Sequence, residues 1–169
     1  GLENMTWKDW VPVVSRYYAM ISQMDAAVGK ILDTLDQIGA NENTAVIYLS
    51  DHGDLCGSHG MLDKHYVLYD DVLRVPLVIR WPGGAKPSRR KEFVSSCLDL
   101  PATISDLTGI DFDRGDGKSL LPLIKGLEQD RPCFSAAASN GQQFGLYTQR
   151  CIRTEKWKYI WNLTDVDEL

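Results

Sequence analysis

Three polar side chains follow one short apolar run and could together bind a cation and an anion. The run, residues 45–49, has the pattern of a buried strand, and Asp51 and His52 come directly after it. A carboxylate supplies a hard oxygen and an imidazole a nitrogen of borderline softness, a pair that suits a divalent cation. Lys64 lies further along the same loop, and its ammonium group suits an anionic ligand. Because ligands of open α/β sheets bind where strands end, this loop is the candidate site.

The motifs around these residues resemble those of the sulfatases, in the alkaline-phosphatase-like superfamily. The ordered set extends over nearly the whole chain and contains Ser50-Asp-His-Gly53, Gly57-x-His-Gly60, Lys64 and the run from Arg74 to Gly83. The resemblance implies an α/β fold in which residues 1–126 are part of an α/β/α mixed sheet. Residues 127–169 would then begin a small C-terminal antiparallel β-subdomain.

The same resemblance implies roles for the polar residues of the loop. Asp51 and His52 match one pair of metal ligands, and Lys64 matches the lysine that holds the sulfate oxygens and assists the leaving group. His59 is a candidate for catalysis and substrate contact, and His65 for substrate contact or for orienting Lys64. Ca²⁺ is the favoured metal, while the imidazole leaves Mn²⁺, Mg²⁺ or Zn²⁺ open. The alternatives are an Asp51 that only caps a turn, a structural His52 and a solvated Lys64. Because the three residues occur together in this order and context, the functional interpretation is favoured.

The nucleophile of this family is absent from the sequence. Sulfatases attack sulfur with formylglycine, made from the Cys or Ser of a Cys/Ser-x-Pro-x-Arg motif, and no such motif occurs here. The family's first pair of aspartate ligands is missing as well. We therefore expect a C-terminal fragment, truncated at both ends, whose partner is the missing N-terminal half of the same enzyme. The fragment alone is expected to be inactive.

Three functions fit this pattern. The first is hydrolysis of a sulfate ester, of a small molecule or a carbohydrate, by the full-length protein. The second keeps the scaffold but hydrolyses a phosphonate monoester or a phosphodiester. The third is a catalytically inactive relative that binds sulfated glycans through Lys64 and the loop.

Composition narrows the range of partners. The net charge of −5 gives no general basic field for nucleic acid or an anionic membrane, and no apolar run is long enough to span a membrane. The four cysteines are widely spaced without a C-x-x-C pair, which argues against a zinc knuckle and a disulfide framework but leaves one disulfide possible. A periplasmic, secreted or lysosomal location follows from the family resemblance alone.

Apolar periodicity predicts the elements that position the loop. Residues 6–38 carry one apolar helical stripe, which predicts a core helix without a catalytic role. Thr6 could cap it, although Pro12 places the start of the continuous helix near itself. We expect a pairing of Arg74 with Asp70 or Asp71, and a solvated basic turn at 85–91. The other expected elements are a strand at 77–81, short helices at 98–109 and 116–126, and β-runs at 133–137, 146–153 and 156–161.

Overall fold

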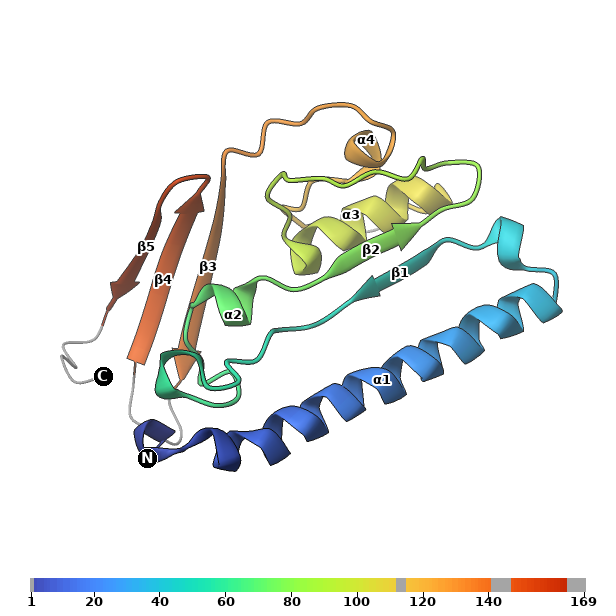
Figure 1. The fold of residues 1–169 in the computed structure, drawn as a ribbon. Helices are drawn as coiled ribbons and strands as arrows, with labels where there is room; N and C mark the ends of the chain where they lie inside the picture. The colour runs from blue at the N-terminus through green and yellow to red at the C-terminus, as the bar shows by residue number, and fades with distance from the viewer. Residues whose placement is uncertain (1, 112–114, 141–146, 164–169) are drawn as a thin grey trace.

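The computed structural model describes residues 2–111, 115–140 and 147–163, so residues 141–146 and 164–169 of the expected C-terminal subdomain lie outside it. Figure 1 shows the arrangement of its helices and strands. Their bounds are α1 Trp7–Gln37, β1 Val46–Leu49, α2 Asp70–Leu73, β2 Leu77–Arg80, α3 Ser96–Thr108, α4 Leu121–Ile124, β3 Cys133–Asn140, β4 Tyr147–Thr154 and β5 Lys158–Asn162. Short 3₁₀ turns occupy Leu2–Asn4, Asn41–Asn43 and Ser58–Gly60.

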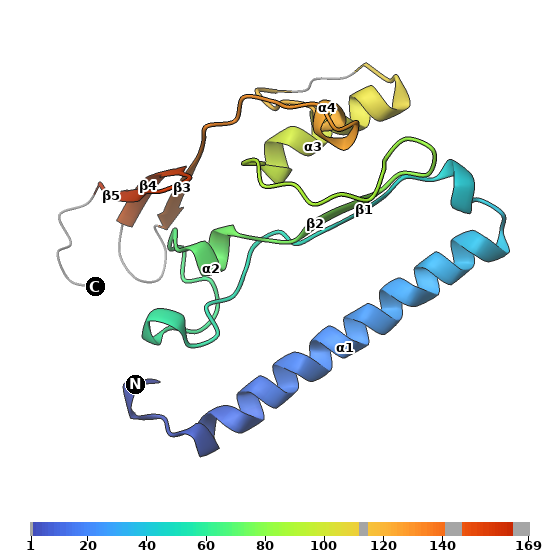
Figure 2. The same ribbon diagram turned by 45° about the horizontal axis from the view of Figure 1, so that its top comes forward.

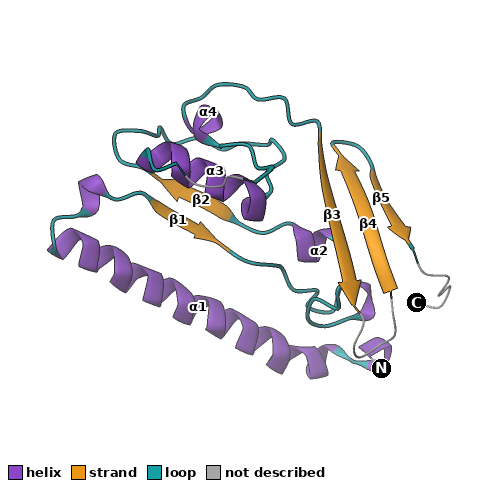
Figure 3. Cartoon of the chain, turned by 180° about the vertical axis from the view of Figure 1, so that it is seen from behind, coloured by secondary structure: helices purple, strands orange, loops and turns teal. Residues whose placement is uncertain are grey.

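The described strands form two antiparallel sheets. β1 pairs with β2 in a register that places Ile47 opposite Ile79, and β3, β4 and β5 form the second sheet in that order. Helix α1 lies on one side of the β1–β2 pair and α3 with α4 on the other (Figure 2). The second sheet stands next to α2 (Figure 3). The fold is therefore α/β with a small C-terminal antiparallel sheet, as predicted.

Helix α1 begins at Trp7, and the expectation that it starts near Pro12 is wrong. The N–H and hydroxyl of Thr6 both donate to the Asp9 carboxylate, at 2.8 and 2.7 Å. This cap satisfies the start of the helix, so the chain turns helical before the proline. Pro12 costs one hydrogen bond inside the helix without ending it. At the other end Gly39 has φ +69°, as a glycine after a helix should.

The apolar stripe of α1 does not form part of a core in this chain. None of its residues is buried, and Trp7, Tyr18, Met20 and Ile31 are each more than half exposed. The prediction that this helix packs in the core is wrong here, because a two-stranded sheet is too narrow to cover a helix of 31 residues. Among the described residues, no helix has both the length and the apolar content to cross a bilayer.

The main core lies instead between the β1–β2 pair and helices α3 and α4. Leu100, Leu120 and Leu123 are its buried centre, and they pack against partly buried residues that include Ile47 and Leu77. These apolar contacts position β1, the strand after which Asp51 and His52 follow.

A buried ion pair fixes the segments around this core. Arg131 donates to the Asp99 carboxylate at 2.7 Å, and each side chain is only 6% exposed. The same carboxylate accepts the N–H groups of Ser95 and Lys118 at 2.8 and 2.9 Å. The guanidinium also donates to the carbonyl of Lys118 at 2.8 Å. Asp99 and Arg131 therefore join α3 to the chain on both sides of α4.

Replacement of Arg131 by Met should destabilise the chain by about 3–5 kcal/mol, because it leaves a buried carboxylate without its counter-charge. Urea unfolding at neutral pH measures the loss. Arg16→Met removes an exposed arginine of α1 that has no ion pair within the described part of the chain, and it should leave the free energy of unfolding within about 0.5 kcal/mol of the parent value. Equal midpoints for the two variants would contradict the role given to the pair.

Candidate active site

The structure brings Lys64 and His52 into contact. Lys64 Nζ lies 3.1 Å from His52 Nε2, and His52 Nδ1 lies 2.8 Å from the carbonyl oxygen of Gly53. A carbonyl only accepts, so Nδ1 carries the ring proton and Nε2 presents its lone pair to the ammonium group. An imidazole held at one nitrogen by a backbone carbonyl is the usual arrangement of a metal-binding histidine.

Asp51 completes this group of three. Its Oδ2 lies 3.5 Å from His52 Nε2, and its Oδ1 accepts the His52 N–H at 2.9 Å. That backbone bond, helped by the positive charge of Lys64, holds the pKa of Asp51 below its ordinary value. The carboxylate therefore stays ionised at neutral pH, as a metal ligand must.

The donor chemistry fits a divalent cation but supplies only two of its ligands. Asp51 offers an exposed carboxylate, and His52 Nε2 on the same side offers a lone pair, which here accepts from Lys64. Within the described part of the chain, no three side chains of the His, Cys, Asp or Glu type gather where they could hold one ion. All four cysteines are free thiols. Further ligands would have to come from elsewhere.

The loop that carries Lys64, residues 50–69 between β1 and α2, is locally strained. Among the described residues, all five non-glycine positions with positive φ fall in it: Cys56, His59, Asp63, His65 and Tyr66. Such conformations cost roughly 1–3 kcal/mol each, and they cluster at functional sites. A small core of Leu55, Val67 and Val72 lies inside the loop, and Leu55 N–H donates to the carbonyl of Asp63 at 3.0 Å. Buried apolar side chains and backbone bonds therefore hold the strained backbone in place.

Gly53 lets this loop approach α2 closely. Its N–H donates to the carbonyl of Val72 at 2.8 Å. A Cβ at this position would lie 1.8 Å from the carbonyl oxygen of Asp71 and 3.2 Å from Val72 Cα. Only glycine fits here, so the residue after His52 is locked against α2.

His59 contacts Tyr69 and Asp71 rather than this group. The His59 ring stacks on Tyr69, with centroids 3.8 Å apart, and its Nε2 lies 3.8 Å from Asp71 Oδ2. His65 is half-buried next to Lys64, with φ +44°. The structure thus joins Asp51, His52 and Lys64, and it directs His59 toward Tyr69 and Asp71.

The prediction that Arg74 pairs with Asp70 or Asp71 is wrong in part. Asp70 forms its ion pairs with Lys158 Nζ at 2.6 Å and Arg153 Nε at 3.6 Å. Hydrogen bonding from Lys158, and then the charges of Lys158, Arg153 and Arg74, lower the pKa of Asp70. Arg74 therefore acts on Asp70 only through its charge. The sequence carries no local signal for Lys158 and Arg153, which lie more than eighty residues away.

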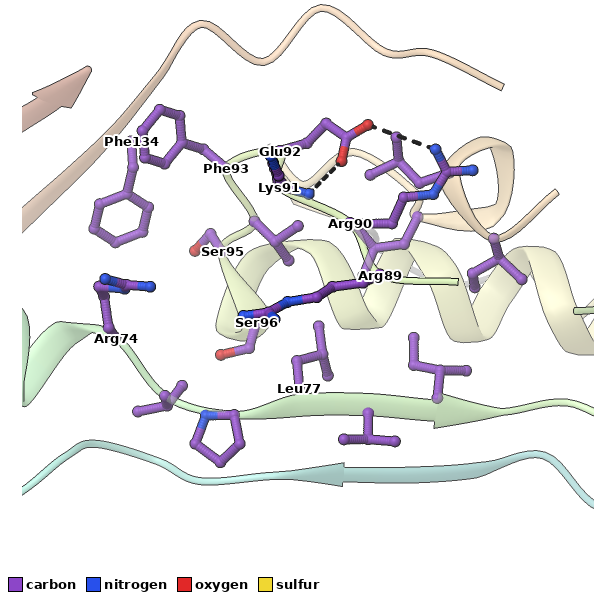
Figure 4. Close-up of a pocket in the computed structure, with 18 of the residues that line it drawn as sticks. Arg74, Leu77, Arg89, Arg90, Lys91, Glu92, Phe93, Ser95, Ser96 and Phe134 are labelled. Atoms are coloured by element: carbon purple, nitrogen blue, oxygen red, sulfur yellow. Dashed lines mark hydrogen bonds and ion pairs between the residues drawn. The ribbon is translucent and has the colours of Figure 1, made fainter. Parts of the chain in front are cut away.

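An open cavity of about 1760 Å³ adjoins this group, and Asp51 and His52 line one part of it. Another wall comes from the segment after β2. Figure 4 shows Arg89 extending over Leu77 toward Ser96, and Arg74 rising from the end of α2. Arg90 pairs with Glu92 at 3.9 Å, whereas Arg89 has no ion pair among the described residues. The basic turn is solvent-exposed at residues 86–91, as predicted, and it also borders this open cavity, where its positive charges attract anions.

Comparisons with known proteins identify the family of this chain. The Sulfatase family profile matches residues 3–110, and the profile described as N-sulphoglucosamine sulphohydrolase, C-terminal, matches residues 57–169. The chain is therefore a member of the sulfatase family, within the alkaline-phosphatase-like superfamily.

Individual relatives agree with this assignment. The chain is 34% identical to a choline-sulfatase of Rhizobium meliloti over 157 residues, which is 90% of the chain and 30% of that protein. It is 28% identical to an N-acetylglucosamine-6-O-sulfatase of Bacteroides thetaiotaomicron, covering 99% of the chain and 31% of the relative. The crystal structure of a phosphonate monoester hydrolase of Agrobacterium radiobacter superposes with a TM-score of 0.82 at 30% identity, covering 94% of this chain and 34% of that one. The chain therefore spans about a third of the length of these relatives.

Gly53→Ala should destabilise the chain by about 1–3 kcal/mol or more, because the added methyl group meets backbone atoms that cannot rotate away. Gly29→Ala is the matched control. Gly29 lies inside α1 with open space around its Cβ position, and alanine there should stabilise the chain by about 0.5–1 kcal/mol. Urea unfolding of both variants should give shifts of opposite sign. A neutral Gly53→Ala would mean that the loop does not depend on this close approach.

Proposed function

We propose that this chain is the C-terminal part of a sulfuric-ester hydrolase. The contact between Lys64 and His52, beside Asp51, carries the proposal, because it gathers a cation-binding pair and a mobile positive charge at the end of β1. Membership of the sulfatase family supports it. The reaction would cleave R–O–SO₃⁻ with water to give the alcohol and sulfate.

Asp51 and His52 are proposed to hold a divalent cation, with Ca²⁺ favoured, together with ligands from outside these 169 residues. The bound ion would supply Lewis-acid polarisation of the sulfate oxygens. The Gly53 carbonyl keeps the His52 proton on Nδ1 and so keeps Nε2 available as a ligand.

Lys64 is proposed to bind the sulfate. With Nε2 engaged by a metal, the ammonium group is free to donate to a sulfate oxygen nearby. There it would oppose the negative charge that spreads over the sulfate oxygens and the leaving oxygen in the transition state. Fixed charges of this kind are usually the largest electrostatic contribution to such catalysis.

The nucleophile is proposed to be a formylglycine outside these 169 residues. Such a group would supply the oxygen nucleophile toward sulfur, and this chain's Lys64 would stabilise the charge on the sulfate oxygens and the leaving oxygen. The exposed apolar face of α1 is consistent with a longer protein, because a soluble domain normally covers such a stripe.

Hydrolysis of a phosphonate monoester is the second candidate. It is supported by the likeness to the Agrobacterium radiobacter phosphonate monoester hydrolase. A sulfate ester and a phosphonate monoester present similar oxyanions, and the three residues of this site suit both. Relative rates on an aryl sulfate and an aryl phosphonate separate the two functions.

Lys64→Met should lower kcat/KM for an aryl sulfate by about 10²–10³-fold in the longer gene product, because it removes a charge that acts on the transition state. Sulfate release measures the effect, and Lys125→Met, which removes an exposed lysine of another segment, should leave the rate unchanged. The 169-residue chain alone should release no sulfate.

Three results would overturn the proposal. One is a gene without an upstream Cys/Ser-x-Pro-x-Arg motif, which removes the nucleophile. Another is full activity of the Lys64→Met enzyme. The third is a longer enzyme that turns over the aryl phosphonate much faster than the aryl sulfate.

A further inference from the structure

The C-terminal sheet contacts the candidate site through an ion-pair cluster on Asp70. Lys158 of β5 donates to Asp70 Oδ1 at 2.6 Å, and Arg153 Nε of β4 lies 3.6 Å from Oδ2. The Lys158 side chain is only 17% exposed and that of Arg153 27%. A short, partly buried bond between an ammonium and a carboxylate is among the stronger hydrogen bonds in proteins. The two cations therefore fix the first residue of α2.

A second bond from the same sheet lies two residues before Asp70. The buried amide of Gln149, in β4, accepts the Leu68 N–H at 3.3 Å through Oε1. Its Nε2 donates to Asn162 Oδ1 at 2.8 Å, so the amide is oriented by β5. The small sheet thus contacts residues 68–70 at two independent points.

The segment that these contacts hold, residues 68–70, connects the two partners of the site, Lys64 and His52. Lys64 precedes the anchored segment, and the Lys64 carbonyl accepts the Val67 N–H at 3.3 Å. Val72 follows it, and the Val72 carbonyl holds the N–H of Gly53, the neighbour of His52. A displacement of residues 68–70 would therefore move Lys64 and His52 relative to each other.

We propose that Lys158, Arg153 and Gln149 are positioning residues, which hold residues 68–70 so that Lys64 meets His52. The loop needs such support, because five of its residues have strained left-handed backbone conformations. The catalytic meaning of this role depends on the proposed function. The positioning itself does not, and it can be measured in the 169-residue chain without any turnover.

Nuclear magnetic resonance of the 169-residue chain tests the role. Lys158→Met should speed amide hydrogen exchange at Leu68 and Gly53 by about tenfold or more, relative to the amides of α3, because it removes a charge-assisted bond. It should also abolish the nuclear Overhauser contact between the Lys64 side chain and the His52 ring. Lys158→Arg should restore both signals, since a guanidinium can still reach the carboxylate. Lys156→Met, two residues away at an exposed position with no ion pair to any described residue, should change neither.

Two outcomes would overturn the role. In one, exchange in Lys158→Met accelerates equally in α3 and in the loop, which would make Lys158 a general stabilising residue. In the other, the Lys64–His52 contact persists with unchanged exchange at Leu68 and Gly53. If Lys158→Met does not fold, Asp70→Asn gives the same test from the other partner, because it keeps the side-chain shape and removes the charge. A longer enzyme that proves to act on phosphonates would leave these readouts unaffected.

Discussion

The hydrogen bond between Lys64 Nζ and His52 Nε2 is the interaction on which the site depends. It exists only because the Gly53 carbonyl takes the other ring nitrogen, which leaves the Nε2 lone pair for a positive partner. The same lone pair would bind a metal ion, so a cation and the lysine compete for one position. A lysine displaced by a bound cation would remain close to it, where an oxyanion is attracted by both charges. This proximity links the proposed metal-binding pair, Asp51 and His52, to the proposed anion-binding group of Lys64.

The loop that makes this contact is stabilised from three directions. Leu55, Val67 and Val72 form its own apolar centre, α2 closes against Gly53, and the C-terminal sheet holds residues 68–70. No single one of these supports spans the loop. Left-handed residues cost free energy, and they persist where the surrounding structure over-determines the backbone. The small C-terminal sheet, remote from the chemistry in sequence, is therefore part of the support of the site.

Local patterns in the sequence predicted the strands on either side of the loop, because apolar runs ended by turn residues specify strands directly. They also identified Asp51, His52 and Lys64 as a group, which the structure places in contact. One failure was local, and the others depended on distant residues. The start of α1 was decided by the Thr6–Asp9 cap, and the exposure of its stripe by the narrow sheet beside it. The partners of Asp70 lie on strands that no periodicity places near α2.

A crystal structure of the longer enzyme with Ca²⁺ and sulfate bound is the most direct test of the central claim. Asp51 and His52 should both ligate the cation, and Lys64 Nζ should lie within hydrogen-bonding distance of a sulfate oxygen. The account would be contradicted if the sulfate bound the cation while Lys64 stayed on His52 or pointed into solvent, or if the cation were held without Asp51 and His52.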